Sequence, residues 1–190
     1  MKIKPTFIQN LMLLERHVHQ DERGVFNRLL ASDELQAETG EMFDIIHINS
    51  STSSTTGTMR GIHFQFPPFA EKKIVSCVSG SVWDVGIDLR PDSPTRFQWY
   101  GTLLTPSNGM SLIIPEGFGH AFITLEPNST VVYLVNSIYS PNHECGILYN
   151  DPLLNINWPI QPKVISEKDR SWGKIEKRFK ELDSGFSQIN

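Results

Sequence analysis

The sequence of 190 residues predicts a single all-β domain, and three features carry that prediction. The middle of the chain is a succession of short runs that are β-branched or alternate between apolar and polar residues, as strands do. Proline and glycine interrupt these runs at short intervals, which is typical of an antiparallel sandwich or barrel. Helix patterns are confined to residues 32–38 and the carboxyl end, so we expect helices to be short accessories.

The predicted elements follow one another with little chain between them. Strands are expected at residues 73–78, 81–89, 110–115, 120–125 and 130–139. Ser79 and Gly80 separate the first two strands and indicate a hairpin turn. Near the carboxyl end, Ser166 and Asp169 have the spacing of a helix capping box, and residues 173–190 are expected to form a helical or flexible tail.

Composition and charge exclude several classes of protein. The formal net charge is −4 and the cations are scattered, so nucleic acid is not an expected partner. No apolar run is long enough for a signal peptide or a bilayer span, which favours a cytoplasmic protein without a membrane partner. The chain is large enough to fold without a disulfide, so Cys77 and Cys145 are expected to be free, buried thiols.

A spacing of glycine, proline and histidine stands out late in the strand-rich region. The pattern G-x5-P-x-G-x2-H is formed by Gly109, Pro115, Gly117 and His120. It resembles the second motif of the cupin jelly-roll barrels, which implies a barrel whose mouth receives the His120 side chain and a small ligand. The alternative is that these residues only form a turn and that His120 is a hydrogen-bonded interior histidine.

Many cupins bind a metal, but this chain departs from their ligand pattern. The first cupin motif normally supplies His-x-His and a downstream Glu, whereas here His63 is followed by Gln65 and no Glu stands at the usual step. Two scattered histidines without a carboxylate at ligand spacing make a poor site for zinc or iron. We therefore expect neither a metal nor another cofactor.

Six segments of the chain together carry a closer resemblance. They are MRGIHFQ (59–65), AEKKIV (70–75), GSVWDVGIDLRPDSPT (80–95), IPEGFGHAF (114–122), YSPNHECGILYNDPLLNINWP (139–159) and ISEKDRSW (165–172). In this order they resemble the dTDP-4-dehydrorhamnose 3,5-epimerase family, a cupin-type group of nucleotide-sugar epimerases. The resemblance implies a homodimer with exchanged amino-terminal strands, here within residues 1–30. It also implies an enzyme that inverts a nucleotide-linked 4-keto-6-deoxyhexose at C3, C5 or both, supplying deoxysugar for a surface polysaccharide.

The resemblance implies four catalytic residues. His63 would be the general base and Asp169 would orient it. Tyr133 would be the proton donor, and Lys73 would lie near the sugar carbonyl. Removing a hydrogen beside a ketone gives an enolate, so the reaction needs a base on one face, an acid on the other and a cation at the oxygen. Singly, each residue also fits a structural place, such as the Ser166 capping box for Asp169 or the core for Tyr133.

The binding residues are inferred in part from position and in part from the resemblance. Arg60 precedes His63 in one predicted strand, and alternation of strand side chains is taken to place both on one face, where Arg60 would hold a diphosphate. The resemblance implies that Arg23 reaches a phosphate across the dimer interface. It further implies contacts from Asn49, His120, Glu144, Lys168 and Tyr139, the last of which would stack on the nucleotide base. A solvated surface place is the alternative for several of these charged residues.

Several positions depart from the family pattern on the nucleotide side. Arg28 stands where the family usually has Glu, and His47 stands where it has Gln. The segment 133–139 also loses a lysine and one of two adjacent tyrosines, which leaves the number of inverted carbons open. A guanidinium only donates, whereas thymine offers an N3–H donor, so one hypothesis is a preference for a CDP-linked or other non-thymidine sugar. The alternative is that Arg28 turns to solvent or to a phosphate and thymine is still accepted.

Two functions of other classes remain as alternatives at this level. One is a metal-dependent cupin oxygenase or isomerase that uses His63 and His120, which stoichiometric metal would favour. The other is a non-catalytic module that binds sugar nucleotides, which tight binding without exchange of solvent protons would favour.

Overall fold

The computed structural model describes residues 1–186, most of whose strands form two facing β-sheets. Within this part of the chain the first sheet has six strands, in an order that interleaves early and late segments of the sequence. In spatial order they are β1 (Lys2–Pro5), β2 (Met12–Glu15), β10 (Met110–Ile114), β7 (Lys73–Ser79), β12 (Ser129–Val135) and β5 (His47–Ser53). Each neighbouring pair is antiparallel.

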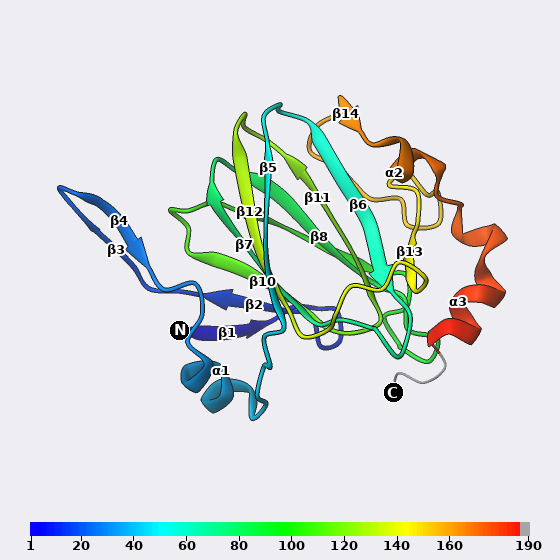
Figure 1. The fold of residues 1–190 in the computed structure, drawn as a ribbon, viewed down its shortest axis with the longest axis horizontal. Coiled ribbons are helices and arrows are strands. Elements are labelled where there is room, and N and C mark those ends of the chain that lie inside the picture. Colours follow the sequence, from blue (N-terminus) through cyan, green and yellow to red (C-terminus); the bar gives the residue numbers. More distant parts are fainter. Residues whose placement is uncertain (187–190) are drawn as a thin grey trace.

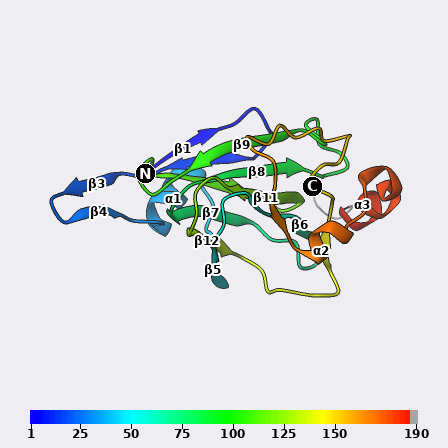
Figure 2. The same cartoon turned by 90° about the horizontal axis from the view of Figure 1, so that it is seen from above.

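The second sheet packs against the first and completes the barrel. Its strands are, in spatial order, β13 (Glu144–Gly146), β6 (Thr58–Gln65), β11 (Phe118–Thr124), β8 (Val82–Asp88) and β9 (Trp99–Leu104), and β14 (Val164–Ile165) runs parallel to β6. Figure 2 shows the strands of both sheets in the body of the molecule, with β3 and β4 projecting at one end and the carboxyl-terminal helix α3 at the other. This arrangement confirms the predicted all-β, jelly-roll fold with short accessory helices.

A hairpin and a few short helices lie outside the two sheets. The hairpin is formed by β3 (Val18–Asp21) and β4 (Gly24–Asn27), and it projects away from the body of the molecule (Figure 1). The helices are α1 (Ser32–Thr39), α2 (Glu167–Ser171), a 3-10 turn (Ile175–Lys177) and α3 (Phe179–Phe186). The helix expected at 32–38 is confirmed. Most of the described part of the tail expected at 173–190 is helical, in the 3-10 turn and α3, and residues 187–190 lie outside the described part.

The turn at Ser79 and Gly80 is not a hairpin, so that prediction is wrong. β7 pairs with β10 and β12 in the first sheet, whereas β8 pairs with β9 and β11 in the second. The turn therefore carries the chain from one sheet to the other. Gly80 has a φ of 68°, and a Cβ there would lie 2.9 Å from the Cα of Ser129. The local sequence indicates the reversal but not the sheet that the next strand joins.

Apolar side chains fill the space between the sheets and cover the outer face of β6. Val75, Leu112 and Phe118 belong to the cluster between the sheets. On the other face of the second sheet, Phe64 packs with Phe186 of α3 and with other carboxyl-terminal residues. β6 is thus buried on most of its length. Both cysteines lie within the described residues and are free and buried, as expected.

The described part of the chain also bears on membrane association. Among residues 1–186, no helix combines the length and the apolar character that crossing a membrane requires.

Candidate active site

Two adjoining cavities open where strands of the two sheets face one another. The first has a volume of about 400 Å³ and is lined by β6, β7, β11, β12 and α2. The second has a volume of about 610 Å³ and is lined by β5, β6, β12 and the segment that leads to β13. Both cavities are lined by His63, Lys73 and Tyr133. Three of the four predicted catalytic side chains therefore lie at the junction of the two spaces.

The fourth, Asp169, reaches this junction from helix α2. Ser166 is the N-cap of the helix, and its Oγ accepts a hydrogen bond from the Asp169 N–H at 3.0 Å. The Asp169 carboxylate forms hydrogen bonds with residues of β6. Its Oδ1 lies 2.6 Å from His63 Nε2, and its Oδ2 accepts from the Gly61 N–H at 3.1 Å. Asp169 therefore takes part in the helix cap through its backbone N–H and contacts His63 through its carboxylate. The cap fixes the start of α2 and so positions the carboxylate.

The surroundings of Asp169 favour its ionised form. Burial alone would raise the pKa of Asp169, but the hydrogen bond and charge of His63, with the Gly61 N–H, outweigh burial and lower it. A carboxylate at Nε2 holds the proton of the imidazole on that nitrogen and leaves the Nδ1 lone pair free. The side chain of His63 is 32% exposed and that of Asp169 is 5% exposed, so the ring is the group that meets the cavity.

Lys73 and Tyr133 lie on neighbouring strands of the opposite sheet. Lys73 begins β7, and its Nζ lies 2.8 Å from Glu71 Oε1. Tyr133 lies on β12, paired with Val75 of β7. Burial raises the pKa of Tyr133, and the charge of Glu71 raises it further against the opposing charge of Arg60. The phenol therefore keeps its proton at neutral pH and can act as an acid.

Arg60 lines the first cavity together with His63, but alternation alone does not explain why. The two residues are three positions apart, so an unbroken strand would point them to opposite faces, and that part of the prediction was wrong. The pairing of β6 with β11 shifts by one residue here, since His63 is opposite His120 and Arg60 is opposite Phe122. This β-bulge turns both side chains to the cavity.

Glycine makes the bulge sterically possible. Gly61 lies between the two residues and has a φ of 109°. A Cβ at Gly61 would lie 2.5 Å from the carbonyl oxygen of His120 on the neighbouring strand. The backbones of β6 and β11 approach so closely there that only glycine fits.

His120 lines the first cavity and is also a hydrogen-bonded interior histidine, while its contact with a ligand stays a prediction. It follows the turn at Gly117, which has a φ of 79°, and it lines the first cavity. Its Nε2 lies 2.8 Å from Asp84 Oδ1, and the two side chains are 9% and 0% exposed. Asp84 Oδ2 is buried with no hydrogen-bond partner within residues 1–186. His120 therefore lines the cavity, and its hydrogen bond with Asp84 fixes the orientation of its ring.

The remaining predicted binding residues divide between the cavities. Lys168 lines the first cavity, and the second is lined by His47, Asn49, Tyr139 and Glu144. A carboxylate joins the two groups, since Glu144 Oε2 accepts from Tyr139 Oη and from Lys168 Nζ, each at 2.5 Å. Burial alone would raise the pKa of Glu144, but these two donors lower it. Tyr139 is 57% exposed, which leaves its ring open to a ligand.

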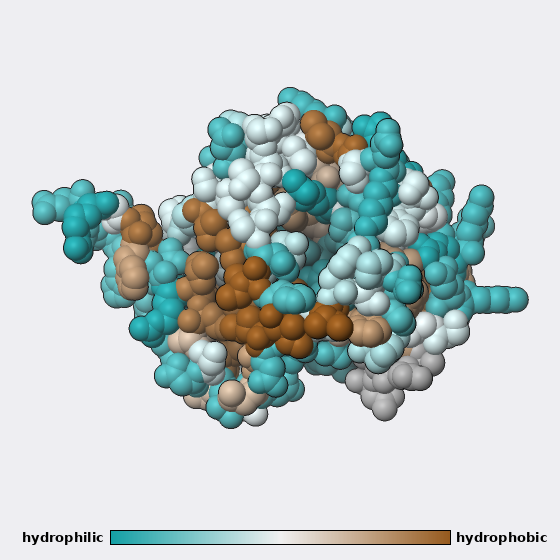
Figure 3. All heavy atoms as spheres, in the orientation of Figure 1, coloured by the Kyte–Doolittle hydropathy of each residue, from teal (hydrophilic) through white to brown (hydrophobic). Residues whose placement is uncertain are grey.

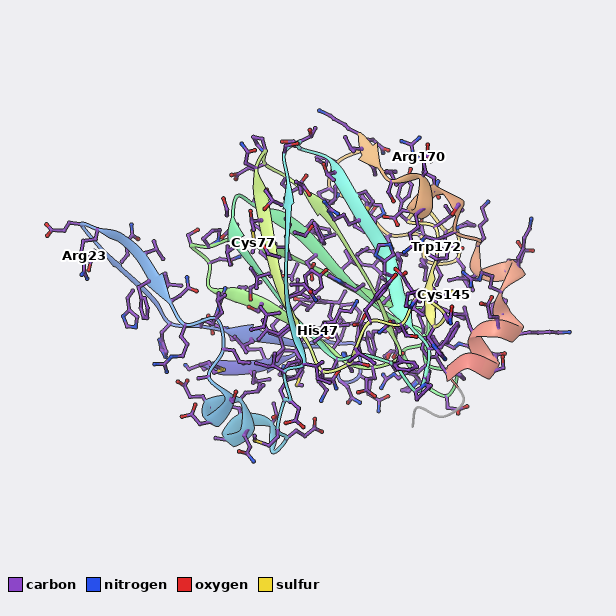
Figure 4. All side chains as sticks on the ribbon, viewed as in Figure 1. Arg23, His47, Cys77, Cys145, Arg170 and Trp172 are labelled. Atoms are coloured by element: carbon purple, nitrogen blue, oxygen red, sulfur yellow. The ribbon has the colours of Figure 1, made fainter. Side chains whose placement is uncertain are left out.

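Arg23 and Arg28 are not brought to the cavities by their own chain. The lining of both cavities, as far as residues 1–186 form it, includes neither arginine. Arg23 lies at the outer end of the β3–β4 hairpin, well away from His47 (Figure 4), and bonds to Asp21 at 2.6 Å. Arg28 Nη1 lies 3.4 Å from Glu34 Oε1. Their predicted contacts with a nucleotide would need a second subunit and stay predictions.

Sequence reasoning did not single out two carboxylates of the site. Asp84 stands in the apolar run VWDVGID, and a charge in a buried strand was the available signal. Glu71 stands in the charged stretch AEKK, where one more carboxylate attracts no notice.

Gln65 stands two residues after His63, where the cupin motif with metal ligands has a second histidine. Its amide donates to the carbonyls of Phe69 and Ile138 at 2.9 and 3.1 Å and accepts from the Ser140 N–H at 2.6 Å. The side chain thus fixes the segment that carries Tyr139. No group of three His, Cys, Asp or Glu side chains suited to a metal occurs within residues 1–186.

Comparison with known proteins agrees with this geometry. The family model described as dTDP-4-dehydrorhamnose 3,5-epimerase matches residues 5–177. The dTDP-4-dehydrorhamnose 3,5-epimerase of Shigella flexneri is 39% identical over 169 residues, which cover 89% of this chain and 93% of the relative.

Solved structures are similar over almost the whole chain. The rmlC epimerase of Mycobacterium tuberculosis superposes with a TM-score of 0.91 at 34% identity, covering 99% of this chain and 96% of that one. The dTDP-6-deoxy-D-glucose-3,5-epimerase of Legionella pneumophila, solved in complex with dTDP-4-keto-L-rhamnose, gives a TM-score of 0.89 at 34% identity, covering 95% and 96% of the two chains. The match in sequence and fold shows that this chain belongs to the dTDP-4-dehydrorhamnose 3,5-epimerase family of cupin-type nucleotide-sugar epimerases.

Proposed function

We propose that this chain inverts C3 and C5 of a dTDP-linked 4-keto-6-deoxyhexose, using His63 as base, Tyr133 as acid and Lys73 as the cation at the ketone. The proposal depends most on one observation: these three side chains line the same junction of two cavities, and Asp169 holds the base at 2.6 Å. Relatives named for this substrate support the choice of sugar nucleotide.

The proton transfers follow from the positions of these groups. His63 Nδ1 takes the hydrogen from the carbon beside the C4 ketone, and the electron pair moves onto the ketone oxygen. The Lys73 ammonium stabilises that enolate, and Asp169 stabilises the imidazolium. Tyr133 Oη then gives its proton to the opposite face of the same carbon. Solvent returns a proton to the phenolate and accepts one from the imidazolium, so the enzyme regains its starting state.

The same groups serve both carbons, because C3 and C5 each adjoin the C4 ketone. Loss of a hydrogen from either carbon gives an enolate on the same oxygen. A cation fixed at that oxygen therefore assists both inversions. The sugar has to present each carbon in turn to His63 and Tyr133.

The second cavity is the proposed place of the nucleotide. Arg60 at the junction supplies a guanidinium for the diphosphate, and its Nε is held at 3.3 Å from Ser53 Oγ. Asn49 and the exposed ring of Tyr139 supply polar and stacking contacts for the base. The pairing of Arg28 with Glu34 favours the alternative in which thymine is still accepted. Competition between CDP and dTDP for the protein distinguishes the two hypotheses.

A homodimer is the proposed assembly. The β3–β4 hairpin projects from the subunit and exposes 48% of Val25 and 68% of Phe26. Apolar side chains also gather on the face crossed by β5 (Figure 3), where Ile46 is 48% and Ile48 is 66% exposed. An exchanged hairpin would cover such surfaces and carry Arg23 of one subunit to the cavity of the other. Sedimentation of the full chain tests this, since a monomer contradicts it.

The activity is tested by solvent-deuterium exchange. The chain is incubated in deuterated water with 4-keto-6-deoxy sugars linked to dTDP, CDP, UDP and GDP, and NMR follows C3 and C5. We expect deuterium at both carbons and inversion of both, with the dTDP sugar preferred. Tight binding without exchange would instead indicate a binding module. Activity that is lost on chelation and regained with a metal would indicate a metal-dependent cupin enzyme.

A further inference from the structure

Glu71 is a cavity carboxylate to which the proposed mechanism gives no task. It lines the second cavity next to Lys73 and Tyr133. Its Oε1 lies 2.8 Å from Lys73 Nζ, and the two side chains are 15% and 9% exposed. An ion pair this well shielded from solvent interacts more strongly than a surface pair. Glu71 therefore acts directly on the cation of the site.

The backbone around Glu71 is fixed from several sides. The Lys72 N–H donates to Asn136 Oδ1 at 2.6 Å, and Lys72 Nζ lies 2.6 Å from Glu41 Oε2. Asn136 in turn donates from Nδ2 to Glu116 Oε1 at 3.0 Å. These contacts hold the start of β7 against the turn before β11 and the end of β12. The Glu71 carboxylate is thus placed by a rigid frame.

The same carboxylate is the anion whose charge acts on Tyr133. The charged and titratable groups around Tyr133 come from every wall, namely His47 on β5, Arg60 and His63 on β6, Glu71 and Lys73 at β7, and His120 on β11. The other nearby carboxylates are engaged elsewhere, Asp169 by His63 and Glu144 by Lys168. After burial, the charge of Glu71 is the largest cause that raises the pKa of Tyr133.

We propose that Glu71 is a positioning residue of the active site, which holds the Lys73 ammonium at the cavity wall and places its negative charge in the same cavity as the Tyr133 phenol. This inference rests on the proposed function. Glu71 transfers no proton in it. The ion pair limits the positions that the flexible Lys73 side chain adopts near the enolate oxygen. After burial, the charge of Glu71 also raises the pKa of the Tyr133 phenol.

The first test measures the Tyr133 proton directly and needs no substrate. The ultraviolet absorbance of tyrosinate is followed against pH, and the curve of Tyr133→Phe is subtracted to isolate Tyr133. We expect Glu71→Gln to move the Tyr133 titration to lower pH, because a neighbouring negative charge is lost. Glu71→Asp keeps the negative charge, so Tyr133 should titrate closer to its pH in the unchanged protein. Glu116→Gln is the matched control, since its carboxylate belongs to the same frame but lines neither cavity within residues 1–186. A Tyr133 titration that does not fall in Glu71→Gln overturns this role.

The second test measures the action of Glu71 through Lys73. We expect Glu71→Gln to lower kcat for inversion of the dTDP sugar about tenfold with little change in KM, because a misplaced group costs rate more than binding. In a Lys73→Met background the same change should have a much smaller effect, because the Lys73 ammonium that Glu71 positions is absent. Equal effects in both backgrounds contradict the positioning role. A wild-type protein that does not turn over the sugar counts against the proposed function alone, since the Tyr133 titration still decides the inference.

Discussion

Two histidine–aspartate pairs of this molecule make the same contact in different surroundings. His63 Nε2 lies 2.6 Å from Asp169, and His120 Nε2 lies 2.8 Å from Asp84. The side chain of His63 is 32% exposed, whereas that of His120 is 9% exposed. The ring of His63 is open to the cavity, whereas the ring of His120 is almost completely buried beside it. We therefore propose that access to the cavity, and not the contact with aspartate, makes His63 the base and leaves His120 a residue that only lines the cavity.

The two aspartates differ as much as the histidines. Asp169 arrives on a capped helix and uses both oxygens, one on His63 and one on the Gly61 N–H. Asp84 sits inside β8 and uses one oxygen, while the other is buried without a partner within residues 1–186. A buried acceptor without a partner costs about 1–3 kcal/mol. We infer that Asp169 activates His63, whereas Asp84 only fixes the position of His120. Each assignment can be tested.

The largest expected effect is on the first pair. His63→Ala and Asp169→Asn should each reduce turnover by about 10²–10⁴-fold, because the base is lost or its tautomer is no longer fixed. Since the two act as one unit, the double variant should be little worse than His63→Ala alone. Steady-state kinetics of the three variants measures this. Multiplied losses in the double variant would mean that the residues act independently.

Tyr133→Phe should separate exchange from inversion. His63 can still remove a proton and return it to the same face, so deuterium should enter the sugar, while inversion slows by about 10²-fold or more without a donor on the other face. NMR of the sugar in deuterated water reports both rates in one sample. If exchange and inversion fall equally, Tyr133 has a binding or folding role instead.

The second pair should show a smaller kinetic effect. Asp84→Asn keeps the size of the side chain but removes the charge that holds His120, so we expect kcat/KM to fall about tenfold and exchange to persist. Asp84→Asn and His120→Ala are compared by kinetics and thermal unfolding. A loss as large as that of Asp169→Asn would show that the wall pair also takes part in proton transfer.

The smallest expected effect is on stability in acid. The pKa of Asp169 is lowered from its usual value of 3.8, so its ionised form stabilises the fold above that pH, and this contribution is lost as pH falls through the lowered pKa. Asp169→Asn should therefore lose stability at neutral pH and show a shallower loss below pH 4 or so. Urea unfolding at several pH values measures it. If the free energy of unfolding depends on pH in the same way in Asp169→Asn and in the unchanged protein, the pKa of Asp169 is not lowered.

The strands were predictable because their information is local. Alternation and turn residues place β7, β8, β10 and β11 within two residues of their observed bounds. The strand expected at 130–139 ends earlier, at Val135 of β12. The partner of each strand depends on contacts far apart in the chain, which explains the wrong hairpin at Ser79 and Gly80. The bulge at Gly61 is likewise fixed by the neighbouring β11 backbone, so strict alternation could not explain why Arg60 and His63 share a cavity.

The site was predictable in its residue types but not in its contacts. The resemblance to a family pointed to His63, Lys73, Tyr133 and Asp169, and the structure brings all four to one junction. No spacing in the chain indicates that a helix cap near the carboxyl end delivers a carboxylate to β6. Glu71 was missed because only the cavity shows that this carboxylate faces Lys73 and Tyr133.

The central claim is that the exposed pair reacts and the wall pair positions. The most direct measurement is deuterium entry at C3 and C5 of the dTDP-linked 4-keto-6-deoxyhexose in His63→Ala and His120→Ala, followed by NMR at equal protein concentration. We predict that His63→Ala loses exchange at both carbons, whereas His120→Ala retains exchange at a reduced rate. Near-normal exchange in His63→Ala, or loss of exchange only in His120→Ala, would contradict the assignment.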